Sequence, residues 1–165
     1  MNARLWRRVV VGGVLFMVIG AGAWPIYRYY WVVSPIPEAF ASALPYEAAL
    51  EAARQADRPV VAVVTADFCP TCQAYKRNGL RDPRVADWVR GHATPVYLEW
   101  ERDADTIQRL GVGGFPATVL IDPGGDVVQM AYGAMPGDRL LAWLEDGQTR
   151  AAHAHADAAA GPGAP

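Results

Sequence analysis

Cys69 and Cys72 are the only cysteines in this chain of 165 residues, and two residues separate them. An apolar run rich in β-branched residues, 59–65, leads into the pair, and a stretch suited to a helix, 73–77, follows it. This order predicts that Cys69 lies at a helix N-terminus, with Pro70 at the first helical position, where its missing N–H costs nothing. Unpaired backbone N–H groups and the helix dipole favour a thiolate there. Cys72, about one turn further on, can form a disulfide with it, so we expect a redox-active dithiol.

Two other uses of the cysteine pair have to be weighed against a redox role. A structural disulfide across four residues would restrict the unfolded chain very little. A metal site needs ligands beyond two thiolates, and no second cluster of Cys or His lies nearby in the sequence. His153 and His155 stand in a low-complexity tail, where an isolated His-x-His is more often incidental than a metal site. The sequence favours redox exchange, with no metal and with the Cys69–Cys72 disulfide in place of a cofactor.

The N-terminal end predicts a membrane segment. Arg4, Arg7 and Arg8 precede 19 residues without charge, 9–27, close to the ~20 residues needed to cross a bilayer. Aromatic rings, which favour the membrane–water boundary, gather at its far end: Trp24, Tyr27, Tyr29, Tyr30 and Trp31. Basic residues ahead of the span place the N-terminus in the cytoplasm. We therefore expect residues 1–33 to be a single-pass inner-membrane anchor, with the following domain in the periplasm.

A cleaved signal peptide is the alternative. Residues 21–23 (Ala-Gly-Ala) and 41–43 (Ala-Ser-Ala) resemble small-residue cleavage sites. Either interpretation exports the domain. From residue 34 onward the chain carries 11 basic and 17 acidic residues, a net charge of −6, which argues against nucleic acid as a partner.

Composition predicts one compact domain between two irregular segments. Residues 34–45 contain three prolines and are expected to be a linker or an irregular first strand. Residues 46–147 are expected to form the domain. Residues 148–165, rich in Ala, Gly and Pro, are expected to be disordered.

Hydrophobic periodicity and turn residues predict the elements of this domain. The expected helices are 46–56, a redox helix ending near 78–79, one starting at 82–83 and running through 89, 103–110, and 138–144 with a stop near Gly147. The expected strands are 60–65, 94–100, 117–121 and 126–131. Strands separated by helices and followed by a hairpin indicate an α/β fold, with a central mixed sheet flanked by helices.

A second motif, Gly114-Phe115-Pro116-Ala117-Thr118, stands just before the third expected strand. Together with Cys69-x-x-Cys72, it resembles the thioredoxin family over about residues 46–146. The closest resemblance is to the C-terminal, exported domain of the disulfide reductase DsbD and its small membrane-anchored relatives. Residues 66–69 (Ala-Asp-Phe-Cys) and 82–85 (Asp-Pro-Arg-Val) are similar to elements of that branch, with Phe68 in place of a Trp. The resemblance implies a thioredoxin-like fold and a cis bond before Pro116.

The resemblance also implies roles for individual residues. Cys69 would be the attacking nucleophile and Cys72 the resolving thiol in thiol–disulfide exchange. Four residues would shape the groove for a partner's backbone: Phe68, Pro70, Phe115 and Pro116. From their place near a strand end, three further residues are expected to line this groove, Glu99, Trp100 and Glu101, with core packing as the alternative for Trp100. The implied partners are thiols or disulfides of exported proteins, and a membrane electron donor of the DsbD type.

The chain departs from the family at three positions. Val63 stands where thioredoxins commonly have a buried Asp, Tyr97 where a Lys often accompanies it, and Lys76 where DsbD-like domains have an acid. With less negative charge and a nearby ammonium, the Cys69 thiolate would be stabilised and the disulfide would be more oxidising. Alternatively, Lys76 points into solvent. Asp67, just before the motif, is either a proton relay or a turn residue.

These observations predict a membrane-anchored thiol–disulfide oxidoreductase in a bacterial periplasm, an oxidising compartment that supplies disulfides. Reduction or isomerisation of exported proteins is the favoured activity, and analogy with family members suggests a role in cytochrome c maturation. A disulfide oxidase of the same fold stays open. So does a non-catalytic binding module or copper-handling domain, since two thiolates suit Cu(I).

Overall fold

The computed structural model describes the backbone of residues 3–160 and the side chains of residues 7–8, 10–28 and 32–152. The chain divides into two units, Met1–Val32 and Val33–Pro165. The helices of the second unit are α2 (Glu38–Ala41), α3 (Tyr46–Ala56), α4 (Pro70–Arg77), the 3-10 turn η1 (Gly79–Arg81), α5 (Pro83–His92), α6 (Ala104–Arg109) and α7 (Gly137–Ala160). Its strands are β1 (Val60–Thr65), β2 (Thr94–Glu99), β3 (Ala117–Ile121) and β4 (Val127–Tyr132).

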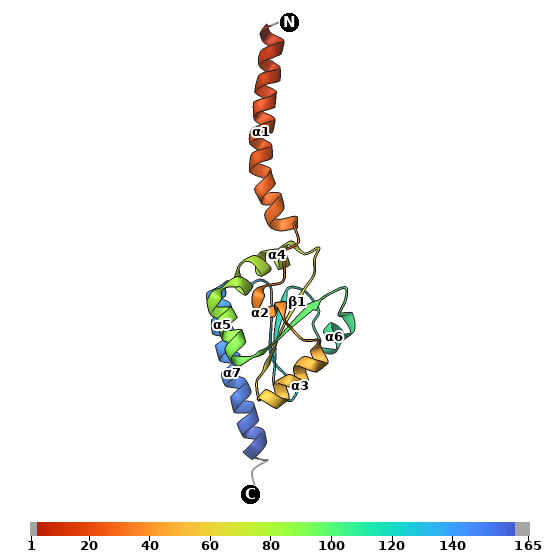
Figure 1. Ribbon diagram of the computed structural model, residues 1–165, viewed down its shortest axis with the longest axis vertical. Helices are drawn as coiled ribbons and strands as arrows, with labels where there is room; N and C mark the ends of the chain where they lie inside the picture. Colours follow the sequence, from red (N-terminus) through yellow and green to blue (C-terminus); the bar gives the residue numbers. More distant parts are fainter. Residues whose placement is uncertain (1–2, 161–165) are drawn as a thin grey trace. The chain divides into compact units, whose positions relative to one another are not determined.

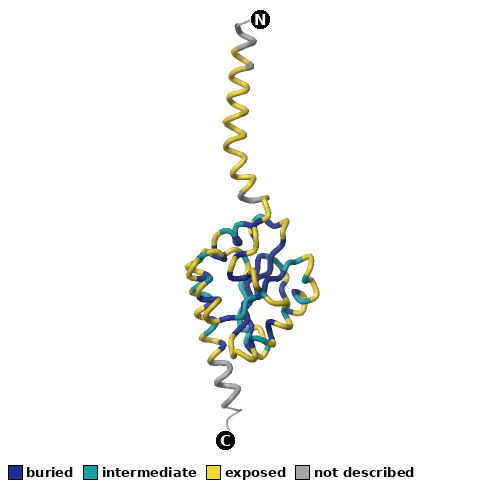
Figure 2. Tube along the Cα trace, viewed as in Figure 1, coloured by how far each residue is buried: buried dark blue, intermediate teal, exposed yellow. Residues whose placement is uncertain are grey.

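The first unit is the helix α1 (Ala3–Trp31), 29 residues long. Within it, Val10–Arg28 has a mean hydropathy of 1.8 and is exposed along its whole length (Figure 2). The helix is long and apolar enough to cross a membrane, and a signal sequence would have the same character. The expected belt residues Tyr29, Tyr30 and Trp31 lie outside the residues whose side chains are described.

The second unit is built on one mixed sheet of four strands in the order β2-β1-β3-β4. Figure 1 shows α5 and α7 on one side of this sheet and α3 and α6 on the other. β1 runs parallel to β2 and antiparallel to β3, and β3 runs antiparallel to β4. All six residues of β1 are buried, as its continuous apolar run predicts for an inner strand. The predicted mixed sheet flanked by helices is confirmed.

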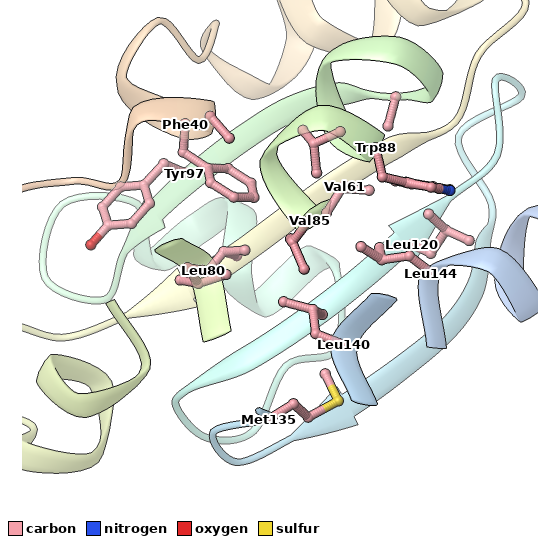
Figure 3. Close-up of a cluster of buried hydrophobic side chains, with 14 of the residues drawn as sticks. Phe40, Val61, Leu80, Val85, Trp88, Tyr97, Leu120, Met135, Leu140 and Leu144 are labelled. Carbon is pink, nitrogen blue, oxygen red and sulfur yellow. The ribbon is translucent and has the colours of Figure 1, made fainter. Parts of the chain in front are cut away.

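Two separate apolar layers hold the helices on the two faces of this sheet. Val61 and Val63 of β1 face a layer that also contains side chains from α2, α5 and α7 (Figure 3). Val60 and Val64, with the opposite orientation, face a layer that includes α3 and α6. The alternation follows the two-residue period of a strand, and it places Thr65 on the same face as Val63.

Helix starts follow the predicted local chemistry. Cys69 is the N-cap of α4, with Pro70 at its first position. Asp82 caps α5, where its Oδ1 accepts a hydrogen bond from the backbone N–H of Arg84 at 2.9 Å. Cys69 therefore sets where α4 begins, and Asp82 sets where α5 begins.

The prediction of a linker or strand at residues 34–45 is wrong. The segment contains α2, and Phe40 is 1% exposed in the core layer that also holds Tyr97 of β2 and Val85 of α5 (Figure 3). Burial of one aromatic side chain outweighs the breaking effect of the prolines around it. The fold of the second unit therefore begins before residue 46.

The predicted stop of the last helix near Gly147 is also wrong. α7 continues to Ala160, so residues 148–160 are helical rather than disordered, and residues 161–165 lie outside the described residues. Gly147 is buried inside the helix, where an added Cβ would lie 2.5 Å from Leu120 Cδ2. This glycine allows α7 to pack closely against the sheet, and the Ala-rich sequence beyond it favours helix. His153 and His155 lie outside the residues whose side chains are described.

Candidate functional site

The cysteine pair stands where the chain leaves β1 and enters α4. Cys69 and Cys72 form a disulfide, with their Cα atoms 5.2 Å apart. Cys69 Sγ accepts a hydrogen bond from the backbone N–H of Cys72 at 3.0 Å. Cys69 is 7% exposed and Cys72 is fully buried, so a partner meets the sulfur of Cys69 first. The backbone N–H groups at the start of α4 are placed to stabilise a thiolate on Cys69 when the disulfide opens.

Aromatic side chains line the surface beside the disulfide. Phe68, 61% exposed, meets the ring of Phe115 edge-on with 5.4 Å between ring centroids. The ring of Trp100 lies 5.0 Å from that of Phe115. Trp100 and Phe115 also pack against the cluster that contains both cysteines. Trp100 therefore packs beside the disulfide, one of the two roles expected for it, and Pro70 is half-buried next to Cys69.

The loop that carries Phe115 is held in place from β4. The Phe115–Pro116 bond is cis, as expected. The Gly133 N–H donates to the Pro116 carbonyl oxygen at 2.8 Å, and the Gly113 N–H donates to the Tyr132 hydroxyl at 3.1 Å. Tyr132 was not singled out from the sequence, because its partner lies 19 residues away along the chain.

Lys76 does not point into solvent. Its side chain is 2% exposed, and its Nζ donates to Asp67 Oδ1 at 3.0 Å. The same Nζ lies 5.6 Å from the centre of the Tyr97 ring. Burial disfavours the ammonium, but Tyr97 and Asp67 outweigh that effect and raise the pKa of Lys76. Asp67 therefore compensates the positive charge of Lys76. As a result, the Lys76 ammonium stabilises a Cys69 thiolate less than an unpaired ammonium would.

A carboxylate that the sequence placed only near the groove lies beside this ion pair. Glu99 is the register partner of Thr65 across β2 and β1, and Thr65 Oγ1 donates to Glu99 Oε2 at 3.1 Å. The hydroxyls of Thr65 and Tyr97 share a hydrogen bond of 2.6 Å. Burial, and then the charge of Asp67, raise the pKa of Glu99 to about 7. Sequence reasoning missed this arrangement, because it depends on the parallel pairing of β1 with β2, which brings the two strand ends together.

Gln73 connects the start of the domain to the redox motif. Its side chain is 1% exposed, and its Oε1 accepts a hydrogen bond from the Ser34 N–H at 2.6 Å. Its Nε2 donates to the Asp67 carbonyl oxygen at 2.9 Å. One buried amide thus holds residue 34 and the loop before Cys69 against α4. Sequence reasoning missed Gln73 because Ser34 lies 39 residues away along the chain.

Acid–base chemistry by a histidine and metal binding are two other uses of side chains to consider near the disulfide. His92 lies on α5 and stacks on Trp88 with 5.2 Å between ring centroids, outside the cluster around the cysteines. Within the part of the chain that the structure describes, no three His, Cys, Asp or Glu side chains are grouped so that they could hold a metal ion.

Comparison with known proteins identifies the fold around this site. A model of the thioredoxin-like domain family matches residues 46–148. Comparison with curated protein sequences finds no match. Among solved structures, a DsbH oxidoreductase has 16% identity and a TM-score of 0.60 over 72% of this chain and 88% of its own. A thioredoxin from Thermus thermophilus has 24% identity and a TM-score of 0.56 over 62% of this chain and 82% of its own. A putative disulphide-isomerase from Bacteroides thetaiotaomicron has 23% identity and a TM-score of 0.56 over 69% and 95%. At these identities the similarity shows the fold.

Proposed function

Since the chain belongs to the thioredoxin-like domain family, we propose that it is a thiol–disulfide oxidoreductase that reduces exported proteins through Cys69 and Cys72. The observation that carries the proposal is the Cys69–Cys72 disulfide at the start of α4, with the more exposed sulfur at the N-cap. The aromatic surface formed by Phe68, Trp100 and Phe115 suits an extended, partly apolar segment of a partner.

The proposed reaction is dithiol–disulfide exchange. The Cys69 thiolate attacks a disulfide of the partner, forms a mixed disulfide and releases one partner thiol. Cys72 then loses its proton and attacks Cys69 Sγ, which closes the protein's own disulfide and releases the second partner thiol. The buried position of Cys72 keeps it unavailable to solvent while its distance from Cys69 remains short.

The charges around the motif support reduction as the direction. Asp67 compensates Lys76, and Glu99 adds a second carboxylate beside the same helix. Negative charge near the dithiol disfavours the thiolate and therefore makes the disulfide less oxidising. A reductase of this kind needs an electron donor, for which we propose a membrane protein of the DsbD type. With α1 as an anchor, the domain would act in the periplasm, where cytochrome c maturation is one process that requires reduced thiols.

The reduction potential of the Cys69–Cys72 couple tests both the chemistry and the direction. The full-length chain, kept in detergent micelles, is equilibrated with thiol buffers of defined potential. We expect a reversible couple near that of thioredoxin, about −270 mV. A potential towards about −120 mV would instead make the protein an oxidant. The absence of any reversible couple would overturn the redox proposal and favour the metal-binding alternative.

Single cysteine variants test the order of the two sulfurs. Cys72→Ser should accumulate a mixed disulfide with a partner, because the resolving thiol is missing. Cys69→Ser should form none, because the remaining sulfur is buried. Non-reducing electrophoresis after acid quenching separates the two results. Equal trapping by both variants would contradict the assignment of Cys69 as the nucleophile.

A further inference from the structure

Five polar side chains form a cluster beside α4 that is buried except at Asp67 and Glu99, and the exchange steps described above use none of them. They are Thr65, Asp67, Lys76, Tyr97 and Glu99. They come from the end of β1, the loop that follows it, α4 and β2. Polar groups in such a place are costly unless every atom finds a partner.

Glu99 is the member whose hydrogen bonding is incomplete. Its Oε2 accepts from Thr65, but its Oε1 is buried and has no hydrogen-bond partner among the described residues. The charges of Asp67 and Lys76 act on this carboxyl with opposite signs, and Glu101 and Arg102 from the segment after β2 also interact with it. Burial of an unpaired carboxylate oxygen disfavours the ionised form, so this partly buried carboxyl keeps its proton to a higher pH than an exposed one.

The cluster lies close to the disulfide through directly packed residues. Thr65 is followed by Ala66, and Glu99 by Trp100, and both following residues pack against the two cysteines. The Trp100 N–H donates to the Thr65 carbonyl oxygen at 2.8 Å, so the two strand ends are held together. Charges separated by such packed side chains interact far more strongly than charges in water.

We propose that Glu99 takes up a proton when the Cys69–Cys72 disulfide is reduced and releases it when the disulfide forms again. This inference rests on the proposed function. Reduction breaks the Sγ–Sγ bond with two electrons from a dithiol donor, which becomes a disulfide and releases two protons. One proton goes to Cys72. Cys69 stays a thiolate, and its negative charge drives the second proton onto the Glu99 carboxylate.

The proton uptake is reciprocal. If a thiolate on Cys69 favours protonation of Glu99, then an ionised Glu99 disfavours the Cys69 thiolate by the same factor. Glu99 would thus supply, from β2, the negative charge that Val63 does not supply from β1. Glu99 acts here through its charge and is a positioning residue rather than a group that touches the partner.

The test is a titration of Glu99 in both redox states. The full-length chain in detergent micelles is labelled with ¹³C on its glutamate carboxyls, and the Glu99 signal is assigned with Glu99→Gln. It is titrated as the disulfide and again after reduction with dithiothreitol. We expect the ionisation constant of Glu99 to fall by about fivefold or more on reduction, the low end of coupling between linked sites. The same ionisation constant in both states would overturn the proposal.

A variant comparison adds a second readout. In Glu99→Gln, the Cys69 thiolate, followed by its ultraviolet absorbance, should form at lower pH than in the wild type. Asp105→Asn removes an exposed carboxylate from α6 and should leave the thiolate titration unchanged. A Glu99→Gln profile that matches the wild type would contradict the proposal, since a purely structural role changes stability and not this titration. If Glu99→Gln does not fold, Glu99→Asp, which also removes the labelled glutamate signal, supplies the assignment and the wild-type titration in the two redox states decides. Failure of the proposed function is a separate result, because it removes the reversible couple itself.

Discussion

Cys69 receives its stabilisation from the backbone of α4 rather than from a neighbouring cation. The N–H of Cys72 already points at its sulfur, whereas Lys76 is paired with Asp67. The sequence predicts that the positive charge of Lys76 makes the disulfide more oxidising. That effect is weakened, because an ion pair has a much weaker field than a lone ammonium. Glu99 adds negative charge to the same region. At this scale the acid with the raised pKa, Glu99, is a residue that no motif marks.

The pH dependence of stability tests the partly buried environment that raises the pKa of Glu99. Its pKa is raised from the ordinary value of 4.5 to about 7. Between these values the folded protein holds a proton that the unfolded chain has lost, so stability falls as pH rises and levels off above about pH 7. Gln cannot ionise. Glu99→Gln should therefore gain about 2 kcal/mol relative to the wild type across this window, after allowance for solvent screening.

The measurement is the free energy of unfolding by denaturant, followed by tryptophan fluorescence at a series of pH values. The comparison is made on the disulfide form, so that thiol ionisation does not contribute. Parallel pH profiles for the two proteins would mean that Glu99 is not held in a buried, proton-binding state.

At the scale of elements, packing changes the meaning of residues that usually end a helix. Gly147 stands where the sequence predicts a stop, yet α7 passes through it because the backbone approaches β3 closely. The three prolines around α2 suggest a linker, yet Phe40 makes the segment part of the core. In both cases a contact with a distant element outweighs the local preference.

Two glycine variants test this interpretation of α7. Gly91→Ala, in α5, has nothing within 4 Å of the new Cβ and should stabilise by up to about 1 kcal/mol through helix propensity. Gly147→Ala should destabilise by about 1–3 kcal/mol, because its Cβ meets Leu120 and Gln129. Thermal unfolding of both variants shows whether each change raises or lowers the stability. A stabilising Gly147→Ala would refute the close packing of α7 against the sheet.

A second pair of variants tests whether α2 belongs to the core. Phe40→Ala should cost about 3 kcal/mol, as expected for the loss of a buried aromatic side chain. Leu44→Ala, a few residues on and 44% exposed, should change stability by less than about 0.5 kcal/mol. If both variants changed the free energy of unfolding by the same amount in denaturant, residues 34–45 would be a linker rather than part of the core.

At the scale of the whole molecule, the domain begins earlier than the part that matches the family. The match starts at residue 46, whereas Gln73 and the core layer already hold Ser34 and Phe40. This bears on the two expected cleavage sites. Cleavage at residues 41–43 would remove Phe40 from the core, so that site conflicts with the fold, whereas residues 21–23 lie within α1.

Membrane fractionation tests the proposed anchor. We expect the chain to stay with the membrane after an alkaline carbonate wash and to keep its original N-terminus, because Val10–Arg28 is apolar over a full span. N-terminal sequencing of the recovered protein is the check. A soluble protein that begins just after residue 23 would establish a signal peptide instead.

Sequence alone determined the features that depend on neighbouring residues. These are the buried strand β1, the N-caps at Cys69 and Asp82, the β3–β4 hairpin and the cysteine pair at a helix start. Only the tertiary structure decided the burial of Lys76, the position of Glu99 beside Thr65, the link from Gln73 to Ser34, and the ends of the domain. The physical reason is distance along the chain. Thr65 and Glu99 are 34 residues apart, and no local pattern reports which side chains meet once the strands pair.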